Sequence, residues 1–344
     1  MSSFAIQRVT AENVRHFPEL IYSVYGYTYE SAWMYEPAKI MEAVDSGRVI
    51  FFLAVNGAGK PKGCLGLGFP FGTRAIGYFT TLVIAPDVRG VESGFIFRDL
   101  TREIGRTASE LAVKAELRVI MSTEVTLHHL SQRLILRYGF VNCGIFLAWC
   151  PPWSDRTREF QSVGSTQRTS SALPRQAYYE RRAEVVSVRA FVTKIPAGQV
   201  CLPARYAGLL REVYRAAKLP ANFIEGRRPD GPTEVEERLD YVRSLGVIDV
   251  TRVGADTIAV IGARMNRLRE GMLDLIHVYL PLTQGDISAE VEALAQQGFR
   301  YCTVIPVYRS GDVLVMQYLN GVASTLTEDQ LFAPLAKTIF RQMS

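Results

Sequence analysis

The sequence of 344 residues lacks the long apolar runs, the clustered metal ligands and the strong charge that would place it in a simple class. No run of about 18 apolar residues occurs, so we expect no helix that spans a membrane. The first residues, MSSFAIQRVTAENVRH, show no basic stretch followed by an apolar one, and we expect no export signal. The net charge of +5 is too small to favour nucleic acid as a partner, although it suits an anionic ligand.

Cysteine and histidine are scarce as well. The five cysteines are odd in number and form no C-x-x-C pair, which favours free thiols in a reducing compartment over disulfides or a zinc site. Only His128 and His129 among the four histidines are adjacent, and neighbours on a helix point about 100° apart. We therefore expect a cytoplasmic protein that holds no metal.

What the sequence does contain is enough apolar residues for two cores. Apolar residues make up 48% and charged residues 21%, and the chain exceeds the ~250–300 residues at which one core stops growing. Residues 151–182 are rich in Ser, Thr, Arg and Pro and have little apolar periodicity, as in a surface linker. We predict lobes at residues 1–150 and 183–344. A strand pattern at residues 184–194 leaves open whether the first lobe continues beyond the linker.

Long helical patterns alternate with paired strand patterns, which predicts an α/β fold with mixed, mostly antiparallel sheets flanked by helices. In the first lobe we expect strands at residues 4–9, 49–55, 63–69, 77–84, 117–123 and 140–149, and helices at residues 11–25, 37–44, 93–111 and 128–138. In the second lobe we expect helices at residues 203–217, 233–244, 265–272 and 287–297, and strands at residues 247–253, 257–261, 275–280, 300–307 and 313–318.

Both lobes contain a strand, a helix, a Gly-Phe pair and a second strand in the same order. Gly139-Phe140 and Gly298-Phe299 occupy the same place in this order. At such a place a glycine ends the helix and the aromatic residue enters the next strand. A distant internal duplication explains the agreement.

The turn after the strand at residues 77–84 leads directly into a long helix, and it reads Ala85-Pro86-Asp87-Val88-Arg89-Gly90. The first N–H groups of a helix have no partner within the helix, and the helix dipole is positive at that end. Such a turn favours an anion, for example a pyrophosphate. The alternative is that Gly90 and Gly94 only allow the chain to turn from strand to helix.

The order of strand, Pro-x-x-Arg-Gly turn, long helix, strand, helix, Gly-Phe and strand resembles the GNAT superfamily of N-acetyltransferases. The segments that carry the resemblance are GYFTTLVIAPDVRGVESGFIFRDL and STEVTLHHLSQRLILRYGF in the first lobe, and QQGFRY with GDVLVMQYL in the second. The resemblance implies two GNAT-like lobes, the second of them degenerate. It also implies acetyl-CoA or another acyl-CoA as cosubstrate.

The family pattern for coenzyme binding is Gln/Arg-x-x-Gly-x-Gly/Ala, preceded by a strand that pairs with the pantetheine arm. By resemblance the coenzyme-binding residues here are Thr81, Leu82, Val83, Arg89, Gly90, Val91, Glu92, Ser93 and Gly94. Glu92 stands where the family has its central glycine, and a carboxylate there repels phosphate. A two-residue insertion that makes Gly94 the central glycine would remove this conflict.

Catalysis shows a second departure, because Ile135 stands where many family members have a tyrosine that protonates the leaving thiolate. Glu124 at a strand end is a candidate to accept a proton from the amine, directly or through water, and His128 is a candidate to donate one. The alternatives are a solvated or salt-bridged Glu124 and a His128 that caps a helix or lies on the surface. In the second lobe Leu294 takes the tyrosine position. We expect that lobe to complete the substrate cleft, support the sheet or make a subunit contact, and not to bind coenzyme.

A tyrosine-rich stretch, IYSVYGYTYESAWMY, lies where family members build the acceptor pocket. The substrate-binding candidates are Tyr25, Tyr27, Tyr29 and Trp33, whose rings suit a cationic or aromatic acceptor. Their alternative role is packing. We expect an N-acyltransferase that acts on a small-molecule or peptide amine, with a catalytically degenerate GNAT-fold binding or regulatory protein as the alternative. Exposed sheet edges would allow a homodimer.

Overall fold

The computed structural model describes residues 4–88, 90–114, 116–152, 181–191, 197–309 and 311–343. Contacts group these residues into two compact units. The first unit extends to residue 120, and the second holds residues 121–151 and the described residues from 181 onward. The contact boundary therefore falls at residue 120, whereas the sequence predicts lobes that divide at residue 150. Most of the predicted linker at residues 151–182 lies outside the described residues.

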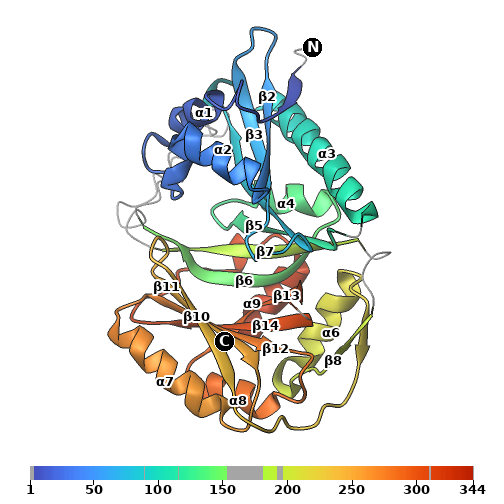
Figure 1. Cartoon of the computed structure of the whole chain (residues 1–344), viewed down its shortest axis with the longest axis vertical. Coiled ribbons are helices and arrows are strands. Elements are labelled where there is room, and N and C mark those ends of the chain that lie inside the picture. Colours follow the sequence, from blue (N-terminus) through green and yellow to red (C-terminus); the bar gives the residue numbers. More distant parts are fainter. Residues whose placement is uncertain are drawn as a thin grey trace. The chain divides into compact units, whose positions relative to one another are not determined.

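The first unit is built on an antiparallel sheet with the strand order β1-β2-β3-β4. Its strands are β1 (Ala5–Arg8), β2 (Val49–Val55), β3 (Pro61–Gly68) and β4 (Ile76–Ile84). Its helices are α1 (His16–Tyr25), η1 (Ala32–Tyr35), α2 (Pro37–Asp45), η2 (Pro86–Val88) and α3 (Val91–Val113). Figure 1 shows α1 and α2 beside one part of this sheet and α3 beside another.

Helix α3 forms because its apolar residues recur every four positions. Ile96, Leu100, Ile104 and Ala108 are each 0% exposed, which is the buried stripe of an amphipathic helix. The helix contacts β2 and β3. This stripe fixes α3, and hence its first turn, against the sheet of the first unit.

Strand β4 contains a bulge. Its pairing with β3 passes from Gly66↔Thr80 to Cys64↔Val83, so two residues of β4 face a single residue of β3. Thr81 at the bulge has a φ of 55°, a conformation that a β-branched residue rarely adopts. Strain of this kind persists only where the surrounding structure enforces it, and it is often found at functional sites.

The second unit contains a sheet with the strand order β5-β7-β6-β13-β14-β12-β11-β10. These strands are β5 (Val119–Val125), β6 (Val141–Cys150), β7 (Arg182–Ala190), β10 (Glu234–Asp240), β11 (Leu245–Arg252), β12 (Leu275–Pro281), β13 (Arg300–Tyr308) and β14 (Gly311–Leu319). A parallel pair, β8 (Gly198–Val200) and β9 (Ala221–Phe223), lies apart. The helices are α4 (His129–Arg137), η5 (Ala204–Tyr206), α6 (Ala207–Ala216), α7 (Thr257–Glu270), α8 (Ser288–Gln296), η6 (Glu328–Gln330) and α9 (Pro334–Gln342).

The second unit contains the same arrangement twice. In β5-α4-β6-β7 and in β12-α8-β13-β14, the last strand returns to lie between the other two. Gly139 and Gly298, each between helix and strand, have positive φ values of 78° and 93°. The shared pattern expected from the sequence is confirmed. The two copies meet where β6 pairs with β13 at Gly144↔Thr303, and a Cβ on Gly144 would lie 2.3 Å from the Cys302 carbonyl oxygen.

The α/β class with mixed, mostly antiparallel sheets is confirmed, but two elements were predicted wrongly. Residues 233–244, expected as a helix, contain the edge strand β10, which pairs with β11 from Glu234↔Arg252 to Asp240↔Leu245. Pairing with a neighbour overrides the helix preference of its Glu, Arg and Leu residues. Residues 257–261, expected as a strand, begin α7, whose buried Ile261, Met265 and Leu268 follow a helical spacing.

All five cysteines lie in the described part of the chain, are buried, and form no disulfide. None of the described helices combines the length and apolar character needed to cross a bilayer.

Candidate functional site

The turn between β4 and α3 is where the sequence predicts an anion site. Gly90, with φ of 106° and ψ of −134°, precedes the helix, which begins at Val91. The hydroxyl of Ser93 donates to the Gly90 carbonyl oxygen at 2.6 Å. Asp87 in the turn forms an ion pair with Lys62 on β3. Arg89 lies outside the described residues, and only the backbone of Val91 is described.

Two glycines in this turn face free space. A Cβ built on Gly90 or on Gly94 would meet no atom within 4 Å. Gly90 needs glycine for its positive φ, but Gly94 is helical and exposed. Glycine in a helix costs about 1 kcal/mol relative to alanine, and nothing in the fold around Gly94 requires it. The free space beside Gly94 leaves room for a ligand to approach the backbone, as it also does beside Gly105 in the same helix. Glu92, half-buried, belongs to the same first helical turn.

The strand candidates lie at and beside the bulge of β4. Thr81 is 7% exposed, and its hydroxyl lies 3.3 Å from the Tyr29 hydroxyl. The thiol of Cys64 on β3 donates to the Thr81 carbonyl oxygen at 3.3 Å. Val83 is buried opposite Cys64, and Leu82 is half-buried. The structure thus joins the predicted coenzyme strand to the predicted acceptor stretch through Thr81 and Tyr29.

The tyrosine-rich stretch divides into a packed part and an exposed part. Tyr25 is 4% exposed, and its ring centroid lies 5.0 Å from that of Tyr29. Trp33 is half-buried. Tyr27 is 80% exposed, and its ring lies 5.6 Å from that of Tyr35. The packing role considered for these residues therefore fits Tyr25, and the substrate-binding role stays a prediction.

A groove of about 530 Å³ lies beside the same turn in the first unit. Lys60 and Lys62 contribute positive charge to its wall, and Glu19 and Asp87 contribute negative charge. The sequence did not reveal this groove because its lining comes from α1, the β2–β3 hairpin and the end of β4. No motif joins these segments.

Glu124 is the buried member of the predicted catalytic pair. It is 2% exposed on β5, and its Oε2 atom accepts a hydrogen bond from the Ser187 hydroxyl at 2.6 Å. Burial raises the pKa of Glu124 to about 8, opposed by the hydroxyls of Ser187 and Ser122 and increased by the charge of Glu184. Glu124 is therefore not solvated, and no salt bridge to it occurs in the described residues. A carboxyl with a pKa near neutrality suits proton transfer.

His128 caps helix α4. Its Nδ1 atom accepts from the backbone N–H of Leu130 at 3.2 Å, which confirms the capping contact considered for it. Burial lowers the pKa of His128, so the imidazole is neutral at pH 7. Its assignment as a proton donor stays a prediction. Ile135, in the place of the family tyrosine, is buried.

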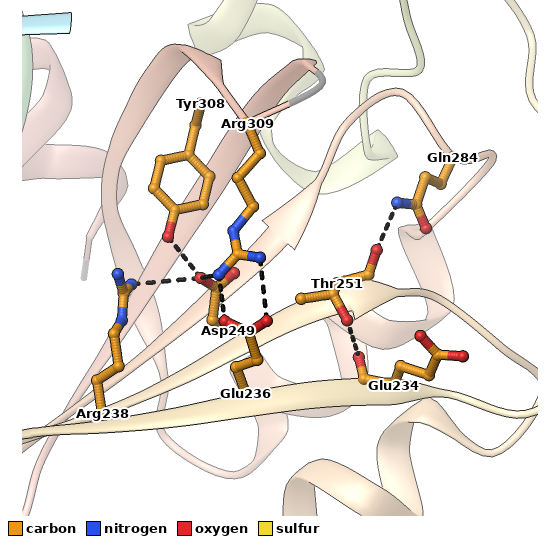
Figure 2. A network of polar contacts seen from close by, with 8 residues as sticks. All are labelled: Glu234, Glu236, Arg238, Asp249, Thr251, Gln284, Tyr308 and Arg309. Carbon is orange, nitrogen blue, oxygen red and sulfur yellow. Dashed lines mark hydrogen bonds and ion pairs between the residues drawn. The ribbon is translucent and has the colours of Figure 1, made fainter. Parts of the chain in front are cut away.

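A polar cluster that sequence reasoning missed lies in the second unit (Figure 2). Asp249 on β11 is 1% exposed and accepts from the Tyr308 hydroxyl at 2.5 Å. Arg238 and Arg309 contact the same carboxylate oxygen at 3.3 and 3.1 Å, and Arg309 also pairs with Glu236. Each charge is matched by an opposite one, so the cluster ties β10, β11 and the end of β13 together. Its members come from three strands and form no sequence motif.

Beyond this cluster, strands β11 and β12 no longer pair, and the side chain of Gln284 forms hydrogen bonds with the backbone instead. The last paired residues are Asp249 and Tyr279. The amide of Gln284 then accepts from the Val253 N–H at 2.9 Å and donates to the Thr251 carbonyl oxygen at 2.8 Å. Figure 2 shows Gln284 reaching Thr251. The chain itself thus satisfies the donor and acceptor that β11 would otherwise offer to a strand-like ligand.

The start of α7 is covered in the same way. The Ala255 N–H donates to the Gly231 carbonyl oxygen at 2.9 Å, and the Thr233 N–H donates to the Asp256 side chain at 2.8 Å. A Cβ on Gly254 would lie 2.3 Å from the Gly231 carbonyl oxygen. Residues 231–233 therefore lie against the helix start. This gives a physical reason for the expectation that this lobe supports the fold.

The described residues contain no group of three or more His, Cys, Asp or Glu side chains placed to hold a metal ion.

No family model and no curated protein sequence matches the chain. Solved structures do match part of it. The ribosomal-protein-S5-alanine acetyltransferase from Vibrio fischeri is 10% identical, with a TM-score of 0.40, and the match covers 57% of this chain and 97% of that one. A GNAT superfamily phosphinothricin acetyltransferase from Sinorhizobium meliloti, in complex with AcCoA, is 14% identical, with a TM-score of 0.39 and coverage of 55% and 89%.

A third match is the spermidine/spermine N-acetyltransferase from Vibrio cholerae, at 11% identity, a TM-score of 0.36 and coverage of 54% and 92%. These are acetyltransferases, and the superfamily named among them is the one that the sequence resembles. Each of these matches covers somewhat more than half of this chain. The likeness concerns the fold alone, and the arrangement as two such lobes stays a prediction.

Proposed function

We propose that this protein transfers an acyl group from acyl-CoA to an amine. The observation that carries the proposal is the β4–α3 turn, in which a helix start adjoins an exposed helical glycine that the fold does not need. Gly94 has free space at its Cβ position and an ordinary helical φ. Glycine at the start of a helix lets the backbone N–H groups approach a phosphate closely.

The coenzyme-binding residues are assigned by the resemblance. The turn residues Gly90, Ser93 and Gly94 would hold the pyrophosphate with their backbone, and Arg89 would add a positive charge. The backbone of residues 81–83 would pair with the pantetheine arm. The strained φ of Thr81 supports a special role for this part of β4.

The acceptor is assigned to the class of amines. The exposed Tyr27 and its neighbouring rings offer an aromatic surface that suits a cationic group. In the reaction the amine nitrogen forms a bond to the thioester carbonyl carbon and the C–S bond breaks. The ammonium group loses two protons, of which Glu124 accepts one and the leaving thiolate the other. Positioning of the two reactants supplies much of the rate, so a strong acid in place of Ile135 is not required.

The alternative function is a GNAT-fold protein that binds a ligand without catalysis. Glu92 in the first turn of α3 and Ile135 in the tyrosine position favour this alternative. The two functions differ in whether an acylated product forms.

A calorimetric titration with acetyl-CoA tests the proposal. We expect saturable binding, reduced about a hundredfold in Gly94→Glu, because the added carboxylate meets the phosphates at the helix start. Gly105→Glu is the matched control, since Gly105 is also a helical residue of α3 with nothing within 4 Å of its Cβ position. Absence of binding at millimolar acetyl-CoA would refute the proposed acyl transfer. Binding without transfer to a panel of polyamines, aminoglycosides and peptide amines would favour the alternative.

A further inference from the structure

A chain of hydrogen bonds crosses three neighbouring strands of the second unit and ends at Glu124. Asn142 on β6 is 2% exposed and lies opposite Ser187 on β7 in the strand pairing. Its Nδ2 atom donates to the Ser187 hydroxyl oxygen at 2.9 Å. Ser187, 0% exposed, lies 2.6 Å from the Oε2 atom of Glu124 on β5. Strand β7 lies between the other two in the sheet.

The direction of this chain is fixed by chemistry. The amide nitrogen of asparagine can only donate, so the Ser187 oxygen accepts from it. The single hydrogen of the hydroxyl is then available for the carboxyl oxygen. A hydrogen bond donated to a carboxylate stabilises its charged form. Ser187 therefore favours the ionised state of Glu124 and fixes the rotation of its carboxyl group.

The second carboxyl oxygen of Glu124 is held differently. Its Oε1 atom is buried, and no hydrogen-bond partner for it occurs in the described part of the chain. Buried oxygens of this kind are normally satisfied by an ordered water. The titratable groups that act on Glu124 are Glu184 from β7 and the Cys143 thiol from β6, and neither is a cation. The surroundings therefore favour uptake of a proton.

We propose that Ser187 and Asn142 are positioning residues that hold Glu124 as the proton acceptor of the acyl transfer, with Oε1 as the atom that receives the proton. This inference rests on the proposed function. The ammonium group of the acceptor gives one proton to a bridging water, which passes a proton to Oε1. The second proton of the attacking nitrogen goes to the thiolate when the C–S bond breaks. Glu124 then releases its proton to solvent.

An NMR titration of the glutamate side-chain carboxyl carbons tests this arrangement, with Glu124→Gln to assign the signal. In the intact chain we expect Glu124 to titrate near pH 8. Ser187→Ala removes the larger of the two hydroxyl contributions, from Ser187 and Ser122, that lower the pKa of Glu124. It should raise the proton affinity about tenfold, which is about one pKa unit. Asn142→Ala frees the Ser187 hydroxyl to rotate and should raise the proton affinity of Glu124 by a smaller factor.

The matched control is Thr126→Val. Thr126 is also buried, and its hydroxyl donates to the Ala183 carbonyl oxygen of β7 at 2.9 Å; it is not among the groups that shift the pKa of Glu124. We expect this variant to lose a similar amount of stability and to leave the titration of Glu124 unchanged. Equal titrations in Ser187→Ala, Asn142→Ala and the intact chain would overturn the inference, as would a Glu124 signal that shifts as much in Thr126→Val.

Turnover separates this inference from the proposed function. If the protein acylates an amine, the pH at half-maximal kcat should move upward in Ser187→Ala together with the NMR titration, and Thr126→Val should leave it in place. If the pH at half-maximal kcat stays the same in Ser187→Ala although the pKa of Glu124 has shifted, Glu124 is not the proton acceptor. Acyl transfer itself would still be established. Absence of acetyl-CoA binding, with the NMR shifts as expected, would refute the proposed function and leave the positioned carboxyl established.

Discussion

Two of the strand-to-helix turns, β4–α3 and β11–α7, differ in what surrounds them. At β4–α3 the glycine Gly94 has no atom within 4 Å of its Cβ position. At β11–α7 a Cβ on Gly254 would lie 2.3 Å from a backbone oxygen. One turn leaves space beside a helix start, and the other fills that space with residues 231–233 of the same chain. The same local order of strand, turn and helix is therefore open beside Gly94 and filled by the chain itself beside Gly254.

The same contrast extends to the strands that precede the helices. Beyond the last pair with β12, the amide of Gln284 bonds β11 at Thr251 and Val253. On β4 the corresponding stretch contains the bulge at Thr81, whose carbonyl oxygen accepts from the weak S–H donor of Cys64. A chain that carries an arrangement twice can keep one copy for a ligand and satisfy the other internally. Each of the following experiments tests that division.

The largest effect is expected from replacing the two glycines by alanine. Gly254→Ala places a methyl group against backbone atoms of residues 231–233, so we expect a loss of about 3 kcal/mol in the free energy of unfolding. Gly94→Ala meets nothing and improves helix propensity, so we expect a gain of about 1 kcal/mol. Thermal melts of the two variants and of the parent chain measure the expected loss of stability in Gly254→Ala and the expected gain in Gly94→Ala.

Gly105→Ala provides the reference for helix propensity alone, because Gly105 is helical and has free space at its Cβ position. Its stability gain should equal that of Gly94→Ala. Only Gly94→Ala should weaken the binding of acetyl-CoA. A destabilised Gly94→Ala, or a neutral Gly254→Ala, would contradict the difference between the turns.

The second effect concerns the two buried carboxylates. Asp249 contacts Tyr308 and the two cations Arg238 and Arg309. Glu124 accepts from the hydroxyl of Ser187, and burial raises its pKa to about 8. Because the folded-state pKa of Glu124 exceeds its ordinary value of 4.5, its stabilising effect is complete below pH 4.5 and is lost as the pH rises to about 8. Glu124→Gln removes this loss and should therefore stabilise the protein increasingly over that range.

The shift corresponds to at most about 5 kcal/mol. We expect about 2 kcal/mol at pH 9, because the amide of glutamine also buries an N–H group without a designed partner. Asp249→Asn should act in the opposite direction, since it leaves Arg238 and Arg309 without their buried counter-charge. Thermal melts from pH 4 to pH 9 compare the two. If the stability change caused by Glu124→Gln and by Asp249→Asn had the same sign and the same pH dependence, the two carboxylates would not differ as described.

The sequence correctly predicted the elements that are determined by their own hydrophobic periodicity. It was misleading for elements whose secondary structure depends on pairing with a neighbouring strand. The spacing of Ile96, Leu100 and Ile104 is sufficient to predict α3, because a buried stripe requires no knowledge of the partner. Strand β10 is different. Its sequence EVEERLD favours a helix, and only pairing with β11 makes it a strand.

The candidate site follows the same division. Gly90 and Gly94 were recognised because a strand-to-helix turn is local in sequence. Ser187 was missed because its role depends on the return of β7 between β5 and β6, after a long intervening segment. Gln284 was missed for a similar reason, since a side chain that replaces strand pairing leaves no periodic pattern.

The smallest effect is expected from a substitution at Gln284. This substitution tests which part of the chain covers the β11–α7 turn. Gln284→Ala removes one donor and one acceptor and leaves Val253 N–H and the Thr251 carbonyl oxygen without their partner. We expect a loss of about 1 kcal/mol in the free energy of unfolding and faster hydrogen exchange at the Val253 amide. Gln296→Ala, at an exposed position of α8, is the control. Acetyl-CoA should still bind once per chain, because residues 231–233 continue to cover α7. A second bound equivalent in Gln284→Ala would show that this one amide had kept the second turn closed.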